Sequence, residues 1–291
     1  MNLQKIIFEM SKKTKLNIFD IELILAYVLK KSREFIIAHP EHKLTKLQIT
    51  NSKLLIKKRL KGLPIAYITG HKEFYGLDFK VNKNVLIPRP ETELMVDETL
   101  KITNGKTIIA DIGTGSGCII ITLAGLIKNC KLFGMDISEK ALAVAKQNAK
   151  VRNVYKKIKF LKGDLLEPIL KNKKFVIGNS SLVILANLPY LTPTQIKNSP
   201  TIKYEPKSAL TAGSDGLKYY RQLFKQIKML RNVSYALCEI DPNQTLKIKK
   251  LIKRELPETT IKIKKDLAGL NRLVIINFKK PFNQISVLCS R

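Results

Sequence analysis

In Ile108-Ile-Ala-Asp-Ile-Gly-Thr-Gly-Ser-Gly-Cys118, an apolar run leads directly into three alternating glycines, and this pattern is the strongest indication of the fold. The run before the glycines predicts a buried strand, and the apolar residues that follow predict a helix over Cys118–Ile127. Gly113, Gly115 and Gly117 let the backbone turn tightly and approach a ligand closely. This strand, turn and helix are typical of an α/β protein that binds a nucleotide-like cofactor.

Asp136 lies about 20 residues further on, at the end of the next expected strand, where a carboxylate can accept both hydroxyls of a ribose. The Gly-x-Gly-x-Gly spacing differs from the Gly-x-Gly-x-x-Gly of NAD sites, and no Walker lysine follows. S-adenosyl-L-methionine is therefore favoured over NAD or ATP. The third strand ends in Lys162-Gly-Asp-Leu165. This predicts Asp164 and Leu165 beside the adenine, with Asp164 accepting from its amino group, unless the segment is an ordinary turn.

Outward from this turn, the chain alternates between strands and helices from residue 106 onward, which predicts a parallel sheet covered on both faces. A short link, Asp266–Asn271, joins the last two strands and predicts an antiparallel terminal hairpin. This α/β pattern resembles the Rossmann-like class I methyltransferase sheet. The strands are expected at Thr107–Asp111, Leu132–Met135, Ile158–Leu161, Leu182–Ala186, Tyr235–Glu239, Ile261–Lys264 and Arg272–Asn277, and the later helices at Glu139–Lys150, Gly216–Leu230 and Asn243–Leu256.

Residues 1–64 carry helical periodicity and predict a small N-terminal helical bundle. Asp20 is expected to cap one helix, and a second is expected over Thr45–Arg59 with Leu47, Ile49, Leu54, Leu55 and Ile56 as its buried face. Residues 65–98 are expected to form short strands, at Ala66–Thr69, Phe74–Tyr75 and Leu77–Val81, and a proline-rich connector. Residues 99–291 form the expected methyltransferase domain, with an appendage after Phe278.

The fourth strand runs into Asn187-Leu-Pro-Tyr190, at the edge where ligands of parallel sheets bind. An amide or ring amino nitrogen is a poor nucleophile because its lone pair is delocalised. The Asn187 side-chain oxygen and a backbone carbonyl such as that of Leu188 can accept both of its N–H hydrogens and hold it in line with a sulfonium methyl. Tyr190 offers a face for stacking. The motif therefore predicts methyl transfer to a planar nitrogen, with Asn187 and Tyr190 as catalytic residues.

A set of more specific motifs resembles the protein-(glutamine-N5) methyltransferases, the PrmC/HemK family. These motifs are Gly62-Leu-Pro-Ile-Ala-Tyr-Ile-Thr-Gly70, Phe74-Tyr-Gly76, Val85-Leu-Ile-Pro-Arg-Pro-Glu-Thr-Glu93, Tyr204-Glu-Pro-Lys-Ser-Ala-Leu210 and Asp266-Leu-Ala-Gly-Leu-Asn-Arg272. The resemblance implies methylation of the glutamine in the Gly-Gly-Gln motif of class-1 peptide chain release factors. It also implies that the N-terminal helices form a substrate-recognition domain. Leu188 departs from the family pattern, which usually has proline there.

The resemblance assigns roles to individual residues. It implies that the cofactor is held by Gly113, Thr114, Gly115, Ser116, Gly117 and Asp136, with Leu165 giving apolar contact to the adenine and Asn187 touching both cofactor and substrate. It implies that Asn187, Leu188, Pro189 and Tyr190 bind the glutamine amide. Arg89 and Glu91 are expected to order the connector beside the cofactor, with direct substrate contact as the alternative.

The charge of the chain leaves two alternatives open. There are 53 Lys and Arg against 23 Asp and Glu, a net charge of +30. This excess indicates either a basic surface for a large partner or a general lysine bias. Because Asn-Leu-Pro-Tyr is also similar to ribosomal RNA adenine dimethyltransferases, the alternative function is adenine-N6 methylation of RNA or DNA, and a scaffold without catalysis is the third reading.

The remaining expectations concern partners and location. No apolar run approaches the roughly 20 residues that a membrane helix needs, and the four cysteines are scattered as reduced thiols would be. We therefore expect a cytoplasmic protein, with a monomer favoured. We also expect neither a membrane association, nor a metal, nor a stable nucleic-acid partner.

Overall fold

The computed structural model describes residues 1–14, 16–172 and 181–278, and the chain divides into two compact units. The first unit comprises Met1–His71 and Ser199–Tyr204. The second comprises the described parts of Lys72–Asn198 and Glu205–Arg291. The appendage expected after Phe278 lies outside the described residues.

The first unit is helical, as its sequence predicts. Its helices are α1 (Leu3–Thr14), α2 (Ile18–Leu29), α3 (Arg33–Ala38), α4 (Lys46–Leu60), α5 (Ile65–Thr69) and the 3-10 helix η4 (Pro200–Tyr204). Buried side chains such as Leu3, Ile24 and Ile56 form its separate hydrophobic core. The Tyr204 hydroxyl donates to the Lys61 carbonyl at 2.6 Å, which ties η4 to the end of α4.

Three expectations for this unit are wrong. Asn17, not Asp20, caps α2, because its side chain accepts from the Phe19 N–H. Asp20 instead accepts a charge-assisted hydrogen bond from Arg59 Nε at 2.7 Å. In α4, the leucines at 47 and 54 are 70% and 52% exposed. They lie seven residues apart on one helix face, whereas the opposite face buries Ser52 and Ile56.

The segment expected as a strand at Ala66–Thr69 is the short helix α5. Its end is set by Gly70, whose φ of +78° is the left-handed conformation that closes a helix. Within this helix Ala66 and Ile68 are buried. Tertiary burial of these two side chains outweighs the β propensity of the surrounding Ile and Thr residues.

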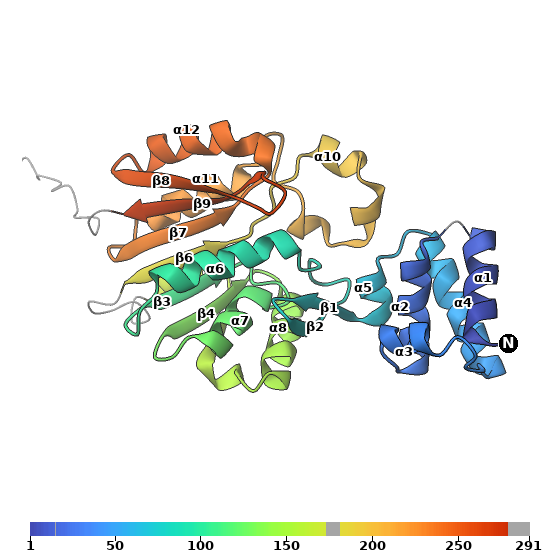
Figure 1. The fold of residues 1–291 in the computed structure, drawn as a ribbon. Helices are drawn as coiled ribbons and strands as arrows, with labels where there is room; N and C mark the ends of the chain where they lie inside the picture. Colours follow the sequence, from blue (N-terminus) through green and yellow to red (C-terminus); the bar gives the residue numbers. More distant parts are fainter. Residues whose placement is uncertain (15, 173–180, 279–291) are drawn as a thin grey trace, which may run out of the picture. The chain divides into compact units, whose positions relative to one another are not determined.

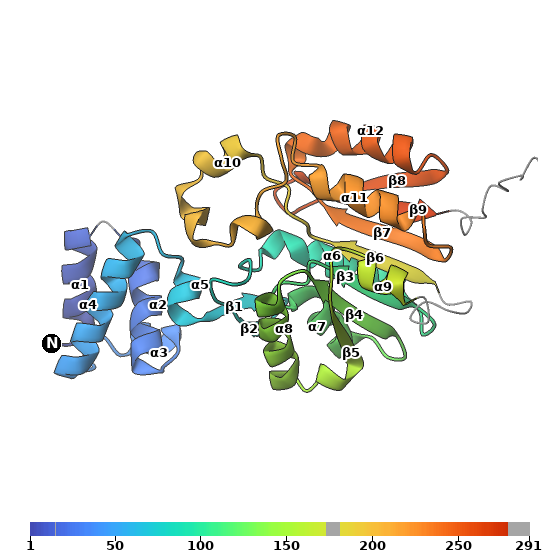
Figure 2. The same cartoon turned by 180° about the vertical axis from the view of Figure 1, so that it is seen from behind.

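In the second unit, seven strands of the described chain form one sheet in the order β5-β4-β3-β6-β7-β9-β8 (Figures 1 and 2). All neighbours are parallel except β9, which is antiparallel to both β7 and β8. This confirms the expected parallel sheet with a terminal hairpin. The strands are β3 (Ile108–Ile112), β4 (Lys131–Asp136), β5 (Ile158–Lys162), β6 (Leu182–Ala186), β7 (Val233–Glu239), β8 (Thr259–Lys265) and β9 (Asn271–Phe278).

Helices cover both faces of this sheet, because successive strand side chains point to opposite sides. Ile108 and Ala110 belong to the core beneath α9 (Glu167–Lys171), α11 (Lys218–Ile227) and α12 (Thr245–Glu255), and Ile109 to the core beneath α6 (Glu93–Ile102), α7 (Cys118–Leu126) and α8 (Glu139–Val151). The shorter elements are α10 (Pro193–Lys197) and the 3-10 helices η2 (Tyr155–Lys157), η5 (Lys207–Ala209) and η6 (Pro242–Gln244). None of the described helices is long and apolar enough to cross a membrane.

A small hairpin and the proline-rich connector precede α6. The hairpin pairs β1 (His71–Phe74) with β2 (Leu77–Lys80), and the connector ends in the 3-10 helix η1 (Pro90–Thr92). The Asn148 side chain of α8 holds the hairpin, since it exchanges hydrogen bonds with the Lys80 backbone at 2.9 and 3.0 Å. This arrangement leads the connector past the carboxyl ends of the strands.

Candidate active site

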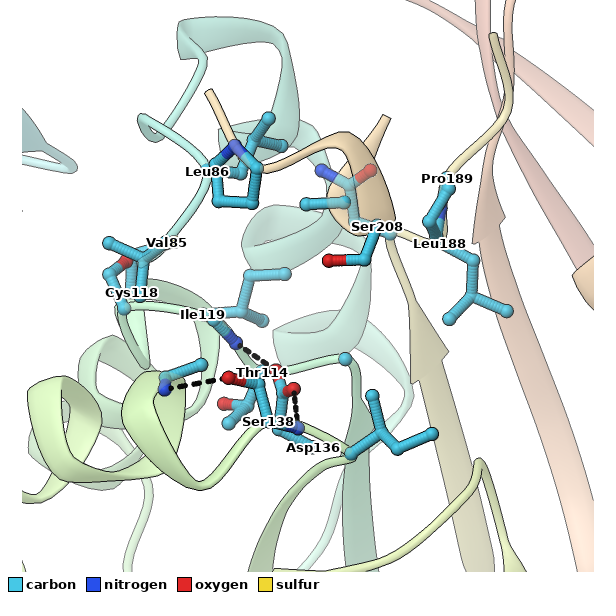
Figure 3. A pocket seen from close by; sticks show the side chains of 18 of the residues that line it. Val85, Leu86, Thr114, Cys118, Ile119, Asp136, Ser138, Leu188, Pro189 and Ser208 are labelled. Carbon is cyan, nitrogen blue, oxygen red and sulfur yellow. Dashed lines mark hydrogen bonds between the residues drawn. The ribbon is translucent and has the colours of Figure 1, made fainter. Parts of the chain in front are cut away.

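A pocket opens at the carboxyl ends of the central strands, within the second unit. Its lining includes every predicted site residue except Gly117 and Tyr190. The connector contributes Val85, Leu86 and Arg89, and the segment around η5 contributes Ser208. In Figure 3, Asp136 and Ser138 lie at the foot of the pocket, and Leu188 and Pro189 lie on its right side. The pocket thus brings together segments from four strand ends, the connector and the η5 segment.

The glycine turn shapes the cofactor half of this pocket. All three of its glycines have positive φ, between +55° and +81°, which is the region that favours glycine. The N–H groups of Gly113 and Thr114 both donate to the Met135 carbonyl, which fixes the turn against β4. A Cβ on Gly117 would lie 2.6 Å from Ile121 Cδ1 and 3.1 Å from Ala145 Cβ. Gly117 is therefore required for helix packing, which explains its absence from the pocket lining.

Two carboxylates lie beneath this turn. Asp136 accepts from the Gly115 N–H at 3.0 Å and from the Ser138 N–H at 2.8 Å. Burial raises the pKa of Asp136 against the opposing effect of these backbone donors. Asp111 accepts from the Thr114 hydroxyl at 2.6 Å, while its Oδ1 has no partner among the described residues. Burial raises the pKa of Asp111 to about 7, and the charge of Asp136 adds to the shift.

The end of β5 forms another wall of the pocket. Asp164 Oδ2 accepts from Gln222 Nε2 of α11 at 2.5 Å, a contact that the sequence did not indicate. Leu165 is 7% exposed and has a φ of +52°. Its side chain therefore joins the hydrophobic core while the residue still lines the pocket.

The other half of the pocket is built around Asn187, directly after β6. Its Nδ2 donates to the Thr92 hydroxyl oxygen at 3.1 Å, and Thr92 is only 2% exposed. The bond orients the amide and leaves Oδ1 as its acceptor. Leu188 is buried, and its Cδ2 would lie 3.3 Å from a Cβ placed on Gly113. Asn187 therefore stands where the cofactor turn and the end of β6 meet.

Tyr190 lies behind the pocket. Its hydroxyl donates to Glu239 Oε1 at 3.3 Å, and burial raises its pKa, with the charge of Glu239 adding to the shift. The Tyr190 carbonyl accepts from Gln244 Nε2 at 2.7 Å. Because Tyr190 is absent from the pocket lining, its role as a stacking face stays a prediction.

The connector is fixed by an ion pair whose carboxylate is buried. Arg89 Nη2 donates to Glu205 Oε1 at 2.5 Å, and Glu205 Oε2 accepts from the Ile87 N–H at 3.1 Å. Glu205 is 5% exposed, and both of its carboxylate oxygens accept a hydrogen bond from the connector. These bonds offset the cost of burying its charge. Sequence reasoning missed Thr92, Glu205 and Glu239. Only the last carried a usable signal, since an acidic residue at the carboxyl end of a parallel strand is a common ligand or support position.

The residues of the cofactor half fit S-adenosyl-L-methionine. Each Asp136 oxygen accepts one backbone hydrogen bond and keeps a lone pair for a ribose hydroxyl. The glycine turn lets the backbone approach a ligand, and the buried carboxylates favour a cationic group. Asp164 retains acceptor capacity for an amino group beside its bond to Gln222.

Comparisons with known proteins identify the class of this fold. A methyltransferase domain model matches residues 103–268. The structure of the hMettl16 catalytic domain in complex with the MAT2A 3′UTR hairpin 6 aligns with a TM-score of 0.57 at 15% identity, over 89% of this chain and 94% of that chain. Together with the sheet order and the glycine turn, these findings define a class I methyltransferase, as the sequence predicts.

The family follows from longer sequence matches. A model of the PrmC N-terminal domain matches residues 8–70. The release factor glutamine methyltransferase of Bacillus anthracis is 36% identical over 87% of this chain and 90% of its own length. That of Thermodesulfovibrio yellowstonii is 36% identical over 94% and 96%. The chain belongs to the family of release factor glutamine methyltransferases, which confirms the resemblance drawn from the motifs.

Proposed function

We propose that this chain transfers the methyl group of S-adenosyl-L-methionine to the side-chain nitrogen (N5) of the glutamine in the Gly-Gly-Gln motif of class-1 peptide chain release factors. The observation that carries the proposal is the Asn187 amide, anchored by Thr92 beside the glycine turn of the pocket. The names of the relatives support the same substrate class.

The chemistry depends on how the substrate nitrogen is held. Asn187 Oδ1 and the Leu188 carbonyl would each accept one N–H of the glutamine amide, so that both hydrogens are bound before reaction. As the nitrogen commits its lone pair to the new N–C bond, positive charge grows on its hydrogens. Both acceptors then bind more strongly, which lowers the barrier.

When bound, the cofactor supplies an electrophilic methyl group on a sulfonium sulfur. Asp136 would hold its ribose, the turn from Gly113 to Gly117 its methionine part, and Asp164 and Leu165 its adenine. The buried Leu188 and the apolar Pro189 would keep water from the reacting nitrogen. After transfer the cationic N-methyl amide releases one proton to water, which restores its neutral planar form. No covalent enzyme intermediate is required.

The substrate has to present its glutamine on an exposed loop that reaches the strand ends, as a Gly-Gly-Gln turn would. We propose that the N-terminal unit, residues 1–64, recognises the body of the release factor. Its surface exposes large apolar side chains, among them Phe8 (56%) and Leu47 (70%), and such exposed groups are common in protein interfaces.

This second role predicts a change in substrate affinity alone. Leu47→Ser should raise KM for the release factor about threefold to tenfold and leave kcat unchanged. The matched control is Leu246→Ser on α12, where the leucine is 73% exposed. Equal effects of the two substitutions would remove the N-terminal surface from substrate recognition.

The proposed function is tested by a tritiated methyl-transfer assay with S-adenosyl-L-methionine. Unmodified release factor, the same factor with its Gly-Gly-Gln glutamine changed to alanine, and ribosomal RNA are offered in parallel. We expect label on the factor that is lost in the alanine variant. Label on RNA alone would contradict the proposal and favour adenine-N6 methylation, which the Asn187-Leu-Pro-Tyr190 motif also allows.

A further inference from the structure

A buried carboxylate lies behind the Asn187 segment and has no part in the chemistry described above. It belongs to Glu239, the last residue of β7, which is 2% exposed and absent from the pocket lining. A buried carboxylate is costly unless its oxygens are satisfied. Yet only Glu239 Oε1 has a hydrogen-bond partner in the described part of the chain, the Tyr190 hydroxyl at 3.3 Å.

The surroundings of Glu239 lead directly to Asn187. The Thr92 side chain lowers the pKa of Glu239, against the effect of burial. The same hydroxyl oxygen accepts from Asn187 Nδ2 at 3.1 Å. Tyr220 reinforces this arrangement, since its hydroxyl is shared between the Ala186 carbonyl, at 3.1 Å, and the Glu239 carbonyl. Glu239 thus borders both ends of the Asn187–Tyr190 segment.

Burial is the largest influence on the charge of this carboxyl. It raises the pKa of Glu239 to about 7, against the opposing effects of Thr92, Arg272 and Tyr190. The titratable and charged groups that interact electrostatically with it come from five elements: Glu91 of η1, Tyr190 after β6, Tyr220 of α11, Arg272 of β9 and the Cys118 thiol of α7. Arg272 Nε also forms an ion pair with Asp266 Oδ2 at 3.1 Å, so Glu239 is not the only carboxylate that its charge stabilises.

We propose that Glu239 is a positioning residue for methyl transfer: its carboxylate holds the Tyr190 hydroxyl and draws the Thr92 proton toward itself, and so fixes the Asn187 amide with Oδ1 facing the substrate nitrogen. The proposal rests on the proposed function of Asn187 as the acceptor for the reacting amide. Hydrogen bonds that follow one another, from Asn187 to Thr92 and from Thr92 to Glu239, polarise one another. A Thr92 oxygen that donates its proton to a carboxylate is a stronger acceptor for Asn187 Nδ2, which places more negative charge on Oδ1.

The proposal requires the ionised form of Glu239. A protonated carboxyl would donate one hydrogen bond itself and could no longer accept both the hydrogen bond from Tyr190 and the proposed one from Thr92. Turnover should therefore rise with pH across the titration of Glu239. The same carboxylate destabilises the folded state above its pKa, because it is buried. Turnover and stability should accordingly move in opposite directions, a contrast that a purely structural carboxylate would not produce.

The first test compares Glu239→Gln with Glu98→Gln, whose carboxylate is also buried but is paired with Lys101 and Lys264. Glu239→Gln should lower kcat about 10- to 100-fold, because the acceptor amide is no longer held rigidly. The dissociation constant for the cofactor and the melting temperature at pH 8 should not worsen, and the rise of kcat around neutral pH should disappear. Thr92→Val should act in the same direction, and Thr92→Ser should restore turnover. Glu98→Gln should leave kcat and its pH profile unchanged.

The second test is independent of the substrate. In protein labelled on asparagine side-chain nitrogen, the Asn187 amide signal is identified by its loss in Asn187→Ala. It should shift between about pH 5.5 and about pH 8.5 in the wild type, and stay constant in Glu239→Gln. If this signal follows Glu239 while no release factor is methylated, the proposed function fails and the coupling stands. A signal that ignores Glu239, or a variant whose kcat stays within twofold of wild type, would overturn the inference.

Discussion

The two halves of the pocket are built in different ways. In the cofactor half, hydrogen bonds join groups close in the sequence, such as Thr114 to Asp111 and Gly115 to Asp136, 21 residues apart. In the reaction half, Asn187 is held by Thr92, 95 residues away, and the carbonyl of Tyr190 by Gln244, 54 residues away. Around the glycine turn, the cofactor half is therefore built from neighbouring segments of the chain, although Asp164 is held by Gln222, 58 residues away. The reaction half exists only when distant segments have packed.

The two halves also share one feature. Each contains a buried carboxyl, Asp111 or Glu239, with one oxygen that has no partner among the described residues. Burial raises the pKa of both to about 7. Each half therefore contains a carboxyl whose pKa lies near neutral pH, and its burial costs folding free energy. Such shifted pKa values are a common property of functional sites.

The largest effect is expected from the reaction half. Asn187→Ala should lower kcat about 100- to 1,000-fold, because one of the two acceptors for the substrate amide is lost. The cofactor dissociation constant should change much less, and Gln147→Ala at an exposed position of α8 serves as the control. Methyl transfer at saturating cofactor measures both. Near-normal turnover of the variant would contradict the mechanism.

A smaller effect of the opposite kind is expected from the cofactor half. Asp136→Asn should weaken cofactor binding about 10- to 100-fold, because an amide cannot accept from both Gly115 and Ser138 and also hold a ribose. Once the cofactor is saturating, kcat should recover to a large extent. Calorimetric titration measures the affinity, with the exposed Asp97→Asn as control. An unchanged affinity would show that Asp136 does not bind the cofactor.

A third prediction tests the long-range support of the reaction half through a pair of glycines. Gly216 and Gly269 both have positive φ, +72° and +77°. A Cβ on Gly216 would overlap the Tyr190 carbonyl and Gln244 Nε2, whereas nothing lies within 4 Å of one on Gly269. Alanine at either position costs about 1–2 kcal/mol of backbone strain.

Only Gly216→Ala should also displace the Tyr190 backbone, and it should lower kcat about tenfold. Kinetic assays and thermal melts of the two variants separate this displacement from the shared strain. If both variants lose the same activity, the overlap at Tyr190 has no catalytic consequence.

The smallest effect concerns stability and pH. Because the pKa of Asp111 rises from 3.8 to about 7 on folding, the folded state binds more protons than the unfolded state between these values. The contribution of Asp111 to stability is thus present at low pH and is lost as pH rises through about 7. The melting temperature of Asp111→Asn, relative to that of the wild type, should therefore be higher at pH 8 than at pH 5. Each kcal/mol of difference in the free energy of unfolding corresponds to about 2–4 °C in Tm.

Thermal melts of the two proteins across this range measure the difference, and Glu239→Gln should show the same trend. The two variants should differ in function, since Asp111→Asn alters the cofactor half and Glu239→Gln alters kcat. A stability difference that is constant with pH would mean that Asp111 is ionised throughout.

The accuracy of sequence-based prediction follows the same division. The strand and helix alternation after residue 106 is matched by β3 to β9 and by the four expected helices, α7, α8, α11 and α12, because each buried strand and amphipathic helix carries its own period. The errors at Ala66–Thr69, Leu47 and Leu54 occur where local patterns are weak. There, packing partners decide whether a short apolar segment is a strand or a helix, and which face is buried.

The sheet class, the cofactor turn with Asp136 and the Asn187-Leu-Pro-Tyr190 segment could be predicted from the sequence, because each is encoded by neighbouring residues with a fixed spacing. Three contacts are visible only in the folded protein: Thr92 holds Asn187, Glu205 holds Arg89, and Glu239 accepts from Tyr190. These contacts join residues 49 to 116 positions apart. No local pattern records such a pairing, because it arises only when the sheet brings the ends of its strands together.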